Sequence, residues 1–571
     1  MILERCTHPH TNHEMLRIVI IAAMAAFGLS AAPAVSSAQQ ALPMKHTGKP
    51  TQTAISQADL MTRIYIFADD SMMGRRAGSE GDTRGTAYIE REVRRLGLVP
   101  GGDNGTFFQA VPLYNRSVDM TSTLAADETA LVVAQDYFPL HPGGRPASLN
   151  GAQVIYAGNT ADSASLIPAA QTVGKVVLFT GPTAALSRRY PGAIAFITPR
   201  PEQQLGQIRA FVAGTSQNMR GDADTASTKL TIVVPETAVQ KFLGVAIESA
   251  RPGTTGRTLT GDVRYKVEEL PARNVVAILP GSDAKLKNQY VSLGAHSDHV
   301  GIRTRGPLDH DSLRAFNRAA ERIYVARTKR SPSFPGAGLT AEERATIKID
   351  LDSLRRIRPA RLDSISNGAD DDGSGSMAML EIAERLAGAR VKPKRSLLFV
   401  WHTGEESGLF GSEYFTDHPT VSRDSIVAQI NMDMIGRGQA DDTPGGGPNY
   451  LQLIGSRRLS TEFGNLIETV NQSPSHGFKF DYSFDANGHP EQIYCRSDHF
   501  SYARYGVPIV FFTTGGHVDY HQVTDEPQYI SYPHLAKVAT FAADVAERVA
   551  NLDHRVVVDK PKPDPKGSCV Q

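Results

Sequence analysis

Five side chains that commonly bind metal ions occur in five separate motifs of this 571-residue chain. They are His296 in Gly-Ala-His-Ser-Asp-His, Asp371 in Gly-Ala-Asp-Asp-Asp-Gly-Ser-Gly, Glu406 in Gly-Glu-Glu-Ser-Gly, Asp433 in Asn-Met-Asp-Met-Ile-Gly and His521 in Asp-Tyr-His-Gln. Two imidazoles and three carboxylates form a ligand set that suits a pair of zinc ions. The chemistry that such a pair performs most readily is hydrolysis by an activated water.

Two residues beside these ligands have side chains suited to the reaction itself. Glu405 immediately precedes Glu406, so one carboxylate can bind metal while the other accepts a proton from water. Tyr520 immediately precedes His521, and its hydroxyl can donate a hydrogen bond to an oxyanion. We therefore predict that Glu405 is the general base and that Tyr520 stabilises the transition state.

Two aspartates are expected to organise the ligands. Asp298 lies two residues after His296 and can hydrogen-bond the imidazole, which would fix its tautomer. Asp371 is the middle residue of three consecutive aspartates. Because adjacent carboxylates repel one another, a nearby cation is their natural compensation. We predict that Asp371 bridges both ions.

Each motif alone also has an ordinary structural interpretation. A histidine such as His296 can be a satisfied core residue, and His299, His310 and His517 are rival ligands nearby. The aspartate run can cap a helix, since a helix N-terminus favours negative charge. Asp433 fits a structural role least well, because a lone carboxylate in an apolar strand costs several kcal/mol unless it is paired. The joint occurrence of five motifs, each at the edge of a predicted strand, favours the metal site.

The elements that must position these residues alternate between strands and helices after Pro271. Apolar runs predict strands at 274–279, 290–294, 395–401, 427–432, 450–454 and 507–513. Helical patterns predict helices at 375–386, 409–415, 460–470, 498–505 and 533–551. This alternation indicates an α/β fold, a three-layer sandwich around a mostly parallel central sheet. The ligands follow the strands, where open α/β sheets place their sites.

The rest of the chain divides by composition. Residues 39–124 contain helices between Ser56 and Gly97, broken at 74–78, and we assign them to the same domain as 266–552. Residues 125–265 hold short apolar strands and none of the candidate ligands, which indicates an inserted β-rich module. An arginine-rich insertion at 303–366 predicts helices at 312–327 and 340–358; it is either a lid over the site or a solvated or oligomer-forming decoration. Residues 553–571 have no core pattern and are expected to be disordered.

The N-terminus predicts export. Arg17 precedes an apolar run at 18–29, and 36–38 is a suitable cleavage site, so 1–38 read as a signal peptide, with Met15 as an alternative start. A membrane anchor is the alternative, although the run is short for a span. We expect a periplasmic or secreted protein, in which Cys495 and Cys569 survive cleavage and have the option of pairing. With 60 basic and 60 acidic residues, net charge attracts the chain to neither nucleic acid nor an anionic membrane.

The motif order resembles the exported di-zinc aminopeptidases of peptidase family M28, in the superfamily of glutamate carboxypeptidase and glutaminyl cyclase. The resemblance covers roughly 56–120 and 270–550, and the inserted module resembles a protease-associated domain. It implies the zinc exopeptidase fold. It further implies that His296 and Asp433 hold one zinc, that Glu406 and His521 hold the other, and that Asp371 is shared. The long insertion at 303–366 departs from the family pattern.

The resemblance also assigns supporting residues. Glu405 would be the general acid and base, Asp298 would support the ligands from behind, and a cis peptide would join Asp371 to Asp372. The segment 496–499 is similar to a pocket segment of the family. The expected activity is therefore the removal of N-terminal residues from peptides, with two zinc ions as cofactors. Alternatives are a carboxypeptidase, a dipeptidase or a glutaminyl cyclase on the same fold, or a non-catalytic binding protein.

Overall fold

The protein is described from a computed structural model, which covers residues 42–49, 52–140, 147–162, 164–182, 186–220, 229–330, 332 and 334–571. The predicted signal peptide at 1–38 lies outside the described residues. Within the described part of the chain, no helix is both long and apolar enough to cross a membrane.

A central sheet of nine strands organises the domain that carries the candidate ligands. Its middle four strands run parallel, in the order β21 (Ser396–His402), β16 (Tyr290–His296), β22 (Ile426–Met432) and β25 (Ile509–Thr513). The other strands flank them: β15 (Arg273–Leu279), β1 (Val99–Pro100) and β2 (Phe108–Ala110) beside β21, and β23 (Tyr450–Ile454) and β24 (Lys479–Asp481) beside β25. The predicted mostly parallel α/β sheet is confirmed.

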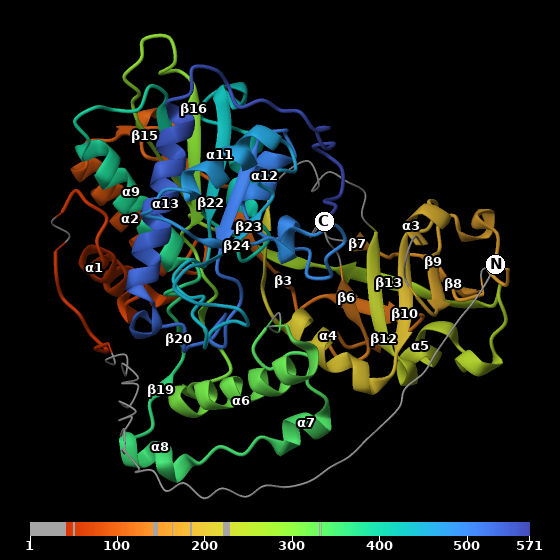
Figure 1. Ribbon diagram of the computed structural model, residues 1–571. Coiled ribbons are helices and arrows are strands. Elements are labelled where there is room, and N and C mark those ends of the chain that lie inside the picture. Colours follow the sequence, from red (N-terminus) through yellow and green to blue (C-terminus); the bar gives the residue numbers. More distant parts are fainter. Residues whose placement is uncertain are drawn as a thin grey trace, which may run out of the picture. The chain divides into compact units, whose positions relative to one another are not determined.

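Helices cover both faces of this sheet (Figure 1). Helices α9 (Gly373–Gly388) and α13 (Tyr532–Ala550) pack on one face, and α10 (Phe410–Asp417) and α12 (His499–Ala503) pack on the other. Strand β21 shows why both faces need cover. Trp401 donates a hydrogen bond of 3.0 Å to the Ser376 carbonyl of α9, whereas Leu398 and Val400 pack with Phe415 of α10. Side chains of a strand alternate between its two faces, so this continuously apolar strand is buried on both.

The N-terminal segment adds two helices to the α9 face. They are α1 (Gln57–Phe67) and α2 (Glu80–Arg95), separated by the short 3-10 segment η1 (Asp70–Arg75). Ser56 and Ser79 cap them by accepting hydrogen bonds from the backbone amides of Asp59 and Asp82. The predicted break at 74–78 is confirmed: Gly74 and Gly78 both have positive φ, at 65° and 69°.

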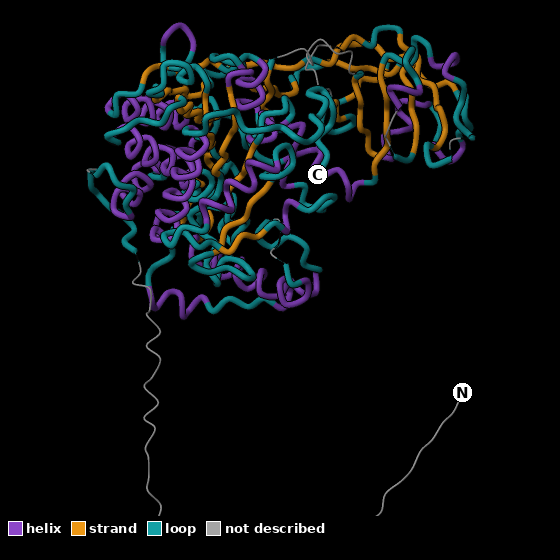
Figure 2. Tube along the Cα trace, turned by 45° about the horizontal axis from the view of Figure 1, so that its top comes forward, coloured by secondary structure: helices purple, strands orange, loops and turns teal. Residues whose placement is uncertain are grey.

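A second sheet of nine strands lies between Thr123 and Val263. Its strands include β8 (Ala152–Asn159), β9 (Val176–Thr180), β10 (Ala195–Arg200) and β12 (Leu230–Pro235), in agreement with the short apolar strands predicted for 125–265. Figure 2 shows two groups of strands, this sheet and the central one, with helices beside each. The segment is β-rich, and its resemblance to a protease-associated domain stays a prediction.

The insertion at 303–366 is closed at its base by two short ladders. Strand β17 (Gly301–Ile302) pairs with β20 (Ile365–Ser366), and β18 (Leu308–Asp309) pairs with β19 (Leu362–Asp363). Helix α6 (His310–Thr328) confirms the first predicted helix. The second prediction was wrong in length, because 340–358 forms two helices, α7 (Ala341–Thr346) and α8 (Leu351–Ile357). Ile347 is extended, and Asp350 starts the new helix by accepting a hydrogen bond from the Ser353 amide.

The tail differs from the predicted disorder. Residues 553–571 contain no helix or strand, yet Cys569 forms a disulfide with Cys495. The side chain of the last residue, Gln571, accepts a hydrogen bond of 2.9 Å from the Tyr494 amide, and Val556 is buried. A covalent link holds this polar segment against the domain, so the tail does not need a hydrophobic core of its own.

Loss of this disulfide should destabilise the protein. The bond closes a loop of 74 residues. By restricting the unfolded chain, a cross-link of this kind raises the free energy of unfolding by about 2–4 kcal/mol. We expect the double variant Cys495→Ser, Cys569→Ser to unfold at a lower urea concentration than the oxidised wild type. The reduced wild type should match the variant. An unchanged midpoint in the variant would show that the tail contributes nothing to stability.

Candidate metal centre

The parallel strands bring four ligand segments to one edge of the central sheet. His296 is the last residue of β16, and Asp433 directly follows β22. Glu406 lies four residues after β21, and His521 lies on the loop after β25. Because parallel strands present their carboxyl ends at the same edge, segments far apart in the sequence converge there.

The fifth ligand segment enters from the start of α9. The peptide bond between Asp371 and Asp372 is cis, as the resemblance implied. The Asp372 side chain accepts hydrogen bonds from the Gly375 amide at 2.8 Å and from the His296 amide at 3.1 Å. It therefore caps the helix and at the same time ties the Asp371 segment to the His296 strand end.

The first candidate ligand group contains His296, Asp371 and Asp433. One ligand atom from each lies within 4.8 Å of the others. The Nε2 atom of His296 is 3.1 Å from Asp371 Oδ1 and 3.6 Å from Asp433 Oδ1. All three residues are buried. The structure thus places this predicted trio around one point.

The second group shares Asp371 and adds Glu406. His521 Nε2 is 3.1 Å from Asp371 Oδ2 and 2.8 Å from Glu406 Oε2. The structure also brings in His299, whose Nδ1 is 2.7 Å from Glu406 Oε1 and 3.7 Å from Asp371 Oδ2. In the sequence His299 was only a rival of His296, yet here it stands beside the other group. The sequence offered one sign that His299 belongs to the site, namely its position three residues after His296.

The charges of these groups fit bound cations. Asp371 Oδ2 and Asp433 Oδ1 are buried and accept no well-oriented hydrogen bond within the described residues. Burial alone would lower the pKa of His521, but its contacts with Asp371 and Glu406 raise that pKa to about 10. Without metal, the carboxylates hold protons on the imidazoles instead. Oxygen and imidazole donors in this arrangement suit zinc ions.

The adjacent glutamates differ in the way that a ligand and a base should. Burial raises the pKa of Glu405 well above its usual value, and the charges of Asp433, Asp498 and Glu406 raise it further. The pKa of Glu406 is lowered, because its hydrogen bonds with His299 and His521 outweigh its burial. Two neighbouring carboxyl groups with opposite shifts can take different roles. Glu405 Oε2 lies 4.0 Å from His296 Nε2, within reach of the same centre.

Asp298 supports the site by a route that differs from the prediction. The hydrogen-bond partner of His296 Nδ1, at 3.1 Å, is the Asp298 backbone carbonyl, while its carboxylate is 3.8 Å away. That carboxylate instead accepts a hydrogen bond of 3.1 Å from the Glu405 amide. Asp298 therefore connects the loop of the first ligand to the loop of the candidate base.

Tyr520 stands at the second group. Its ring centroid is 4.0 Å from that of His521. Burial and the charges of Asp371 and Glu406 raise the pKa of Tyr520 well above its usual value, so its hydroxyl stays protonated at neutral pH. A neutral phenol can donate a hydrogen bond, as the predicted role requires.

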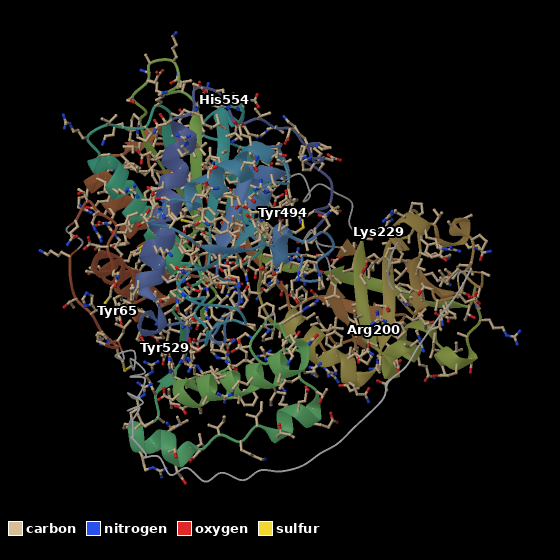
Figure 3. All side chains as sticks on the ribbon, viewed as in Figure 1. Tyr65, Arg200, Lys229, Tyr494, Tyr529 and His554 are labelled. Atoms are coloured by element: carbon tan, nitrogen blue, oxygen red, sulfur yellow. A yellow bond between two sulfur atoms is a disulfide. The ribbon has the colours of Figure 1, made fainter. Side chains whose placement is uncertain are left out.

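A buried network that the sequence did not reveal holds these loops in place. The Asp525 carboxylate accepts hydrogen bonds from the Asp370 amide at 3.0 Å and the Asp371 amide at 3.1 Å. Asp519 pairs with Arg437 and, at 2.9 Å, with Arg314 of α6. The Arg314 guanidinium also lies 3.6 Å from the centroid of the Tyr529 ring, which Figure 3 labels beside α6. The insertion is thus anchored to the loop that carries Tyr520 and His521.

A cavity of about 100 Å³ opens beside Asp433 and Tyr520. Ser497, from the predicted pocket segment, lines it and donates a hydrogen bond of 2.8 Å to Asp433 Oδ2. Pro332 of the insertion lines it as well. The apolar part of the wall consists of Met434, Phe484, Ile493 and Phe511. The cavity suits an apolar side chain held next to the metal centre.

Part of the chain matches a known protein family. Residues 350–546, which include four of the five predicted ligands, match the family described as peptidase family M28. Among curated relatives, leupeptin-inactivating enzyme 1 of Streptomyces exfoliatus is 29% identical over 172 residues, which are 30% of this chain and 34% of that protein. Leucine aminopeptidase 1 of Aspergillus fumigatus is 26% identical over 210 residues, 35% of this chain and 50% of that protein.

The matches to the curated relatives cover only part of those proteins. The chain spans about a third to a half of the length of these two curated relatives. Among solved structures, an aminopeptidase from Aneurinibacillus sp. strain AM-1 aligns with 89% of this chain and 97% of its own, at 17% identity and a TM-score of 0.47. A zinc aminopeptidase from Bacillus subtilis aligns with 87% and 95%, at 16% identity and a TM-score of 0.43.

The roles of the two histidines at the second group can be separated by substitution. We expect His521→Ala to leave one zinc ion per chain, because its Nε2 lies close to both Asp371 Oδ2 and Glu406 Oε2. His299 could also bind an ion together with Asp371 and Glu406, but we predict that it orients Glu406, so His299→Ala should keep two ions with affinity weakened about 10–100-fold. Elemental analysis after dialysis against dilute zinc measures both. The opposite result, with the ion lost only from His299→Ala, would make His299 the ligand.

Proposed function

We propose that this protein is a di-zinc aminopeptidase that hydrolyses the N-terminal peptide bond of peptides. The observation that carries the proposal is that two ligand groups share Asp371 and have Glu405 beside them. A shared carboxylate is what two closely spaced ions require, and a free carboxylate next to them is what water activation requires. The aminopeptidase names of relatives in the family support the choice of peptide end.

The ligands divide between the two ions. His296 and Asp433 would hold one zinc, Glu406 and His521 the other, and Asp371 both. Bound together, the ions would polarise the scissile carbonyl and lower the pKa of a water. Asp372 and Asp298 hold the loops of the ligands and of Glu405 in place by accepting hydrogen bonds from their backbone amides.

The protein side chains then carry the proton and the developing charge. Glu405 accepts a proton from the attacking water and delivers it to the nitrogen of the leaving amine. Tyr520 donates a hydrogen bond to the carbonyl oxygen as that oxygen gains negative charge. The free amine of the substrate is held by the acidic side chains of Glu405 and Asp433. Such an anchor restricts cleavage to the first residue of a peptide.

Other reactions on this fold are less well supported. A glutaminyl cyclase uses a single zinc, whereas this chain retains both His296 and Asp433 as well as the second group. A carboxypeptidase or dipeptidase would need a cationic group to hold the carboxylate of its substrate. The cavity contains Arg496, but this arginine is paired with Glu491 at 3.7 Å, so its charge is already partly neutralised. A binding protein would not need the complete set of ligands and base.

We also propose that the protein is exported and acts in the periplasm or outside the cell. The apolar run at 18–29 supports this proposal. The disulfide between Cys495 and Cys569 supports it independently, because such bonds persist in oxidising compartments.

Zinc content and hydrolysis of leucine p-nitroanilide test the function together. We expect two zinc ions per chain, loss of activity with a chelator, and recovery with zinc. Glu405→Gln should keep both ions and lower kcat by at least about 100-fold, because it removes the proton acceptor. Glu405→Asp is the matched control and should retain part of the activity. Unchanged kcat in Glu405→Gln would remove this residue from the base role, and zinc-free active enzyme would refute the proposal.

The insertion supplies an aromatic ring at the edge of the site. Phe334 is 41% exposed, and its ring centroid is 5.2 Å from that of Tyr520. An exposed ring in this place is suited to contact a substrate side chain. Phe334→Ala should therefore raise KM for leucine p-nitroanilide, with kcat/KM about 10-fold lower.

The control for this variant is Phe211→Ala. Phe211 is 55% exposed on α4 (Leu205–Ala213). This helix lies in the β-rich segment at 125–265, which contains none of the candidate ligands. Both variants should retain two zinc ions. Equal kinetics for the two variants would exclude Phe334 from substrate binding.

A further inference from the structure

Arg75 is a fully buried arginine at the end of η1, in the sequence Gly-Arg-Arg-Ala-Gly that breaks the N-terminal helices. Among the described residues, no carboxylate lies within ion-pair distance of its guanidinium. A buried charge normally needs such a partner, because desolvation costs several kcal/mol. The contacts that Arg75 makes instead explain its position.

The guanidinium of Arg75 donates hydrogen bonds to backbone carbonyls in two loops, the one that starts with His296 and the one that leads to Asp371. Its Nε donates to Ser297 O at 3.1 Å, in the loop that starts with His296. Its Nη1 and Nη2 donate to Asn367 O at 2.6 Å and Gly368 O at 2.9 Å, in the segment that leads to Asp371. One rigid planar group thus connects two loops that come from different elements.

The backbone of Arg75 adds to this connection. Its carbonyl oxygen accepts a hydrogen bond of 3.1 Å from the amide of His299. The preceding residue, Gly74, packs so closely that a Cβ atom would lie 2.6 Å from Ser366 O and 2.8 Å from Gly301 O. Both residues have positive φ, 65° for Gly74 and 46° for Arg75. The turn is therefore built to bring Arg75 against the ligand loops.

The positive charge of Arg75 interacts with nearby carboxylates that it does not touch. Burial lowers the pKa of Arg75 to about 10, and the charges of Asp525, Asp371, Asp298 and Asp372 oppose that shift. The group therefore stays protonated at neutral pH. Its positive charge offsets part of the repulsion among the carboxylates that must all be ionised to bind metal.

We propose that Arg75 is a positioning residue of the metal centre, which fixes the His296 and Asp371 loops at the separation that lets both bind one pair of ions. This inference rests on the proposed function. It predicts an effect of Arg75 on zinc affinity, apart from any effect on folding.

Arg63 provides a matched control for Arg75. It is also fully buried and lies in the same N-terminal segment, on α1. Its guanidinium binds three carboxylates, with Nε 2.6 Å from Glu381 Oε1, Nη1 3.0 Å from Glu92 Oε2 and Nη2 2.5 Å from Glu384 Oε2. None of these partners belongs to a ligand loop. Arg63→Met should thus destabilise the fold without changing the metal centre.

The experiment measures zinc affinity of the full chain by competition with a chromophoric chelator. Melting temperatures are recorded for the metal-free and the zinc-loaded protein. Arg75→Met should bind zinc about 10–100-fold more weakly than wild type, the usual effect of losing a group that orients ligands. Arg75→Lys keeps the charge but not the planar fork, and should lose about 10-fold. The zinc-induced rise in melting temperature should shrink in the same order.

Arg63→Met should lower the melting temperature of the metal-free protein, while its zinc affinity stays within about threefold of wild type. If Arg75→Met does not fold, Arg75→Lys decides the question alone. Wild-type affinity in the Arg75 variants would overturn the inference and leave the proposed function intact. A wild-type protein that binds no zinc would overturn the proposed function and this inference with it.

Discussion

Repulsion among buried carboxylates is the constraint on which the rest of this structure depends. Asp371, Glu405, Glu406 and Asp433 converge at one edge of a sheet, and all four are largely removed from water. Burial and mutual repulsion make each of them costly to ionise. The pKa values of Glu405 and Asp433 are raised, whereas contacts with histidines keep the pKa values of Asp371 and Glu406 low. The structure places imidazoles between them and leaves oxygen atoms directed at shared points. Bound cations would offset the negative charge that the fold gathers in this way.

The surrounding structure lowers the cost of this arrangement through the backbone. Amides of Asp370 and Asp371 donate to Asp525, and the amides of His296 and Glu405 donate to Asp372 and Asp298. Each of these outer carboxylates thus accepts at least one hydrogen bond from a peptide amide of a ligand segment or of the Glu405 loop. These hydrogen bonds hold the loops at the strand ends in fixed positions. Preorganisation of this kind is what metal-assisted hydrolysis requires of a protein.

The sequence identified candidate ligands because strand ends can be recognised from apolar periodicity. A run such as 427–432 predicts a buried strand, and a carboxylate at its end then needs an explanation. The same reasoning does not reach Arg75 or Asp525, whose contacts are with residues far away in the chain, and it named His299 only as a rival of His296. It also left the pairing of Cys495 with Cys569 open, and it joined α7 and α8 into one helix. Long-range contacts decided these cases except the last, in which extended Ile347 ends α7 and Asp350 caps α8 locally.

The insertion shows how such contacts change the interpretation of a segment. Its composition allowed either a lid or a solvated decoration. In the structure, Arg314 pairs with buried Asp519, and Asn317 of the same helix donates a hydrogen bond of 3.1 Å to the Val518 carbonyl. Asp519 is held on its other side by Arg437 and directly precedes Tyr520. The loop that carries Tyr520 and His521 is therefore held partly by the insertion. Removal of the insertion would remove the contacts that Arg314 and Asn317 make with this loop, which favours a structural role for the segment over a solvated decoration.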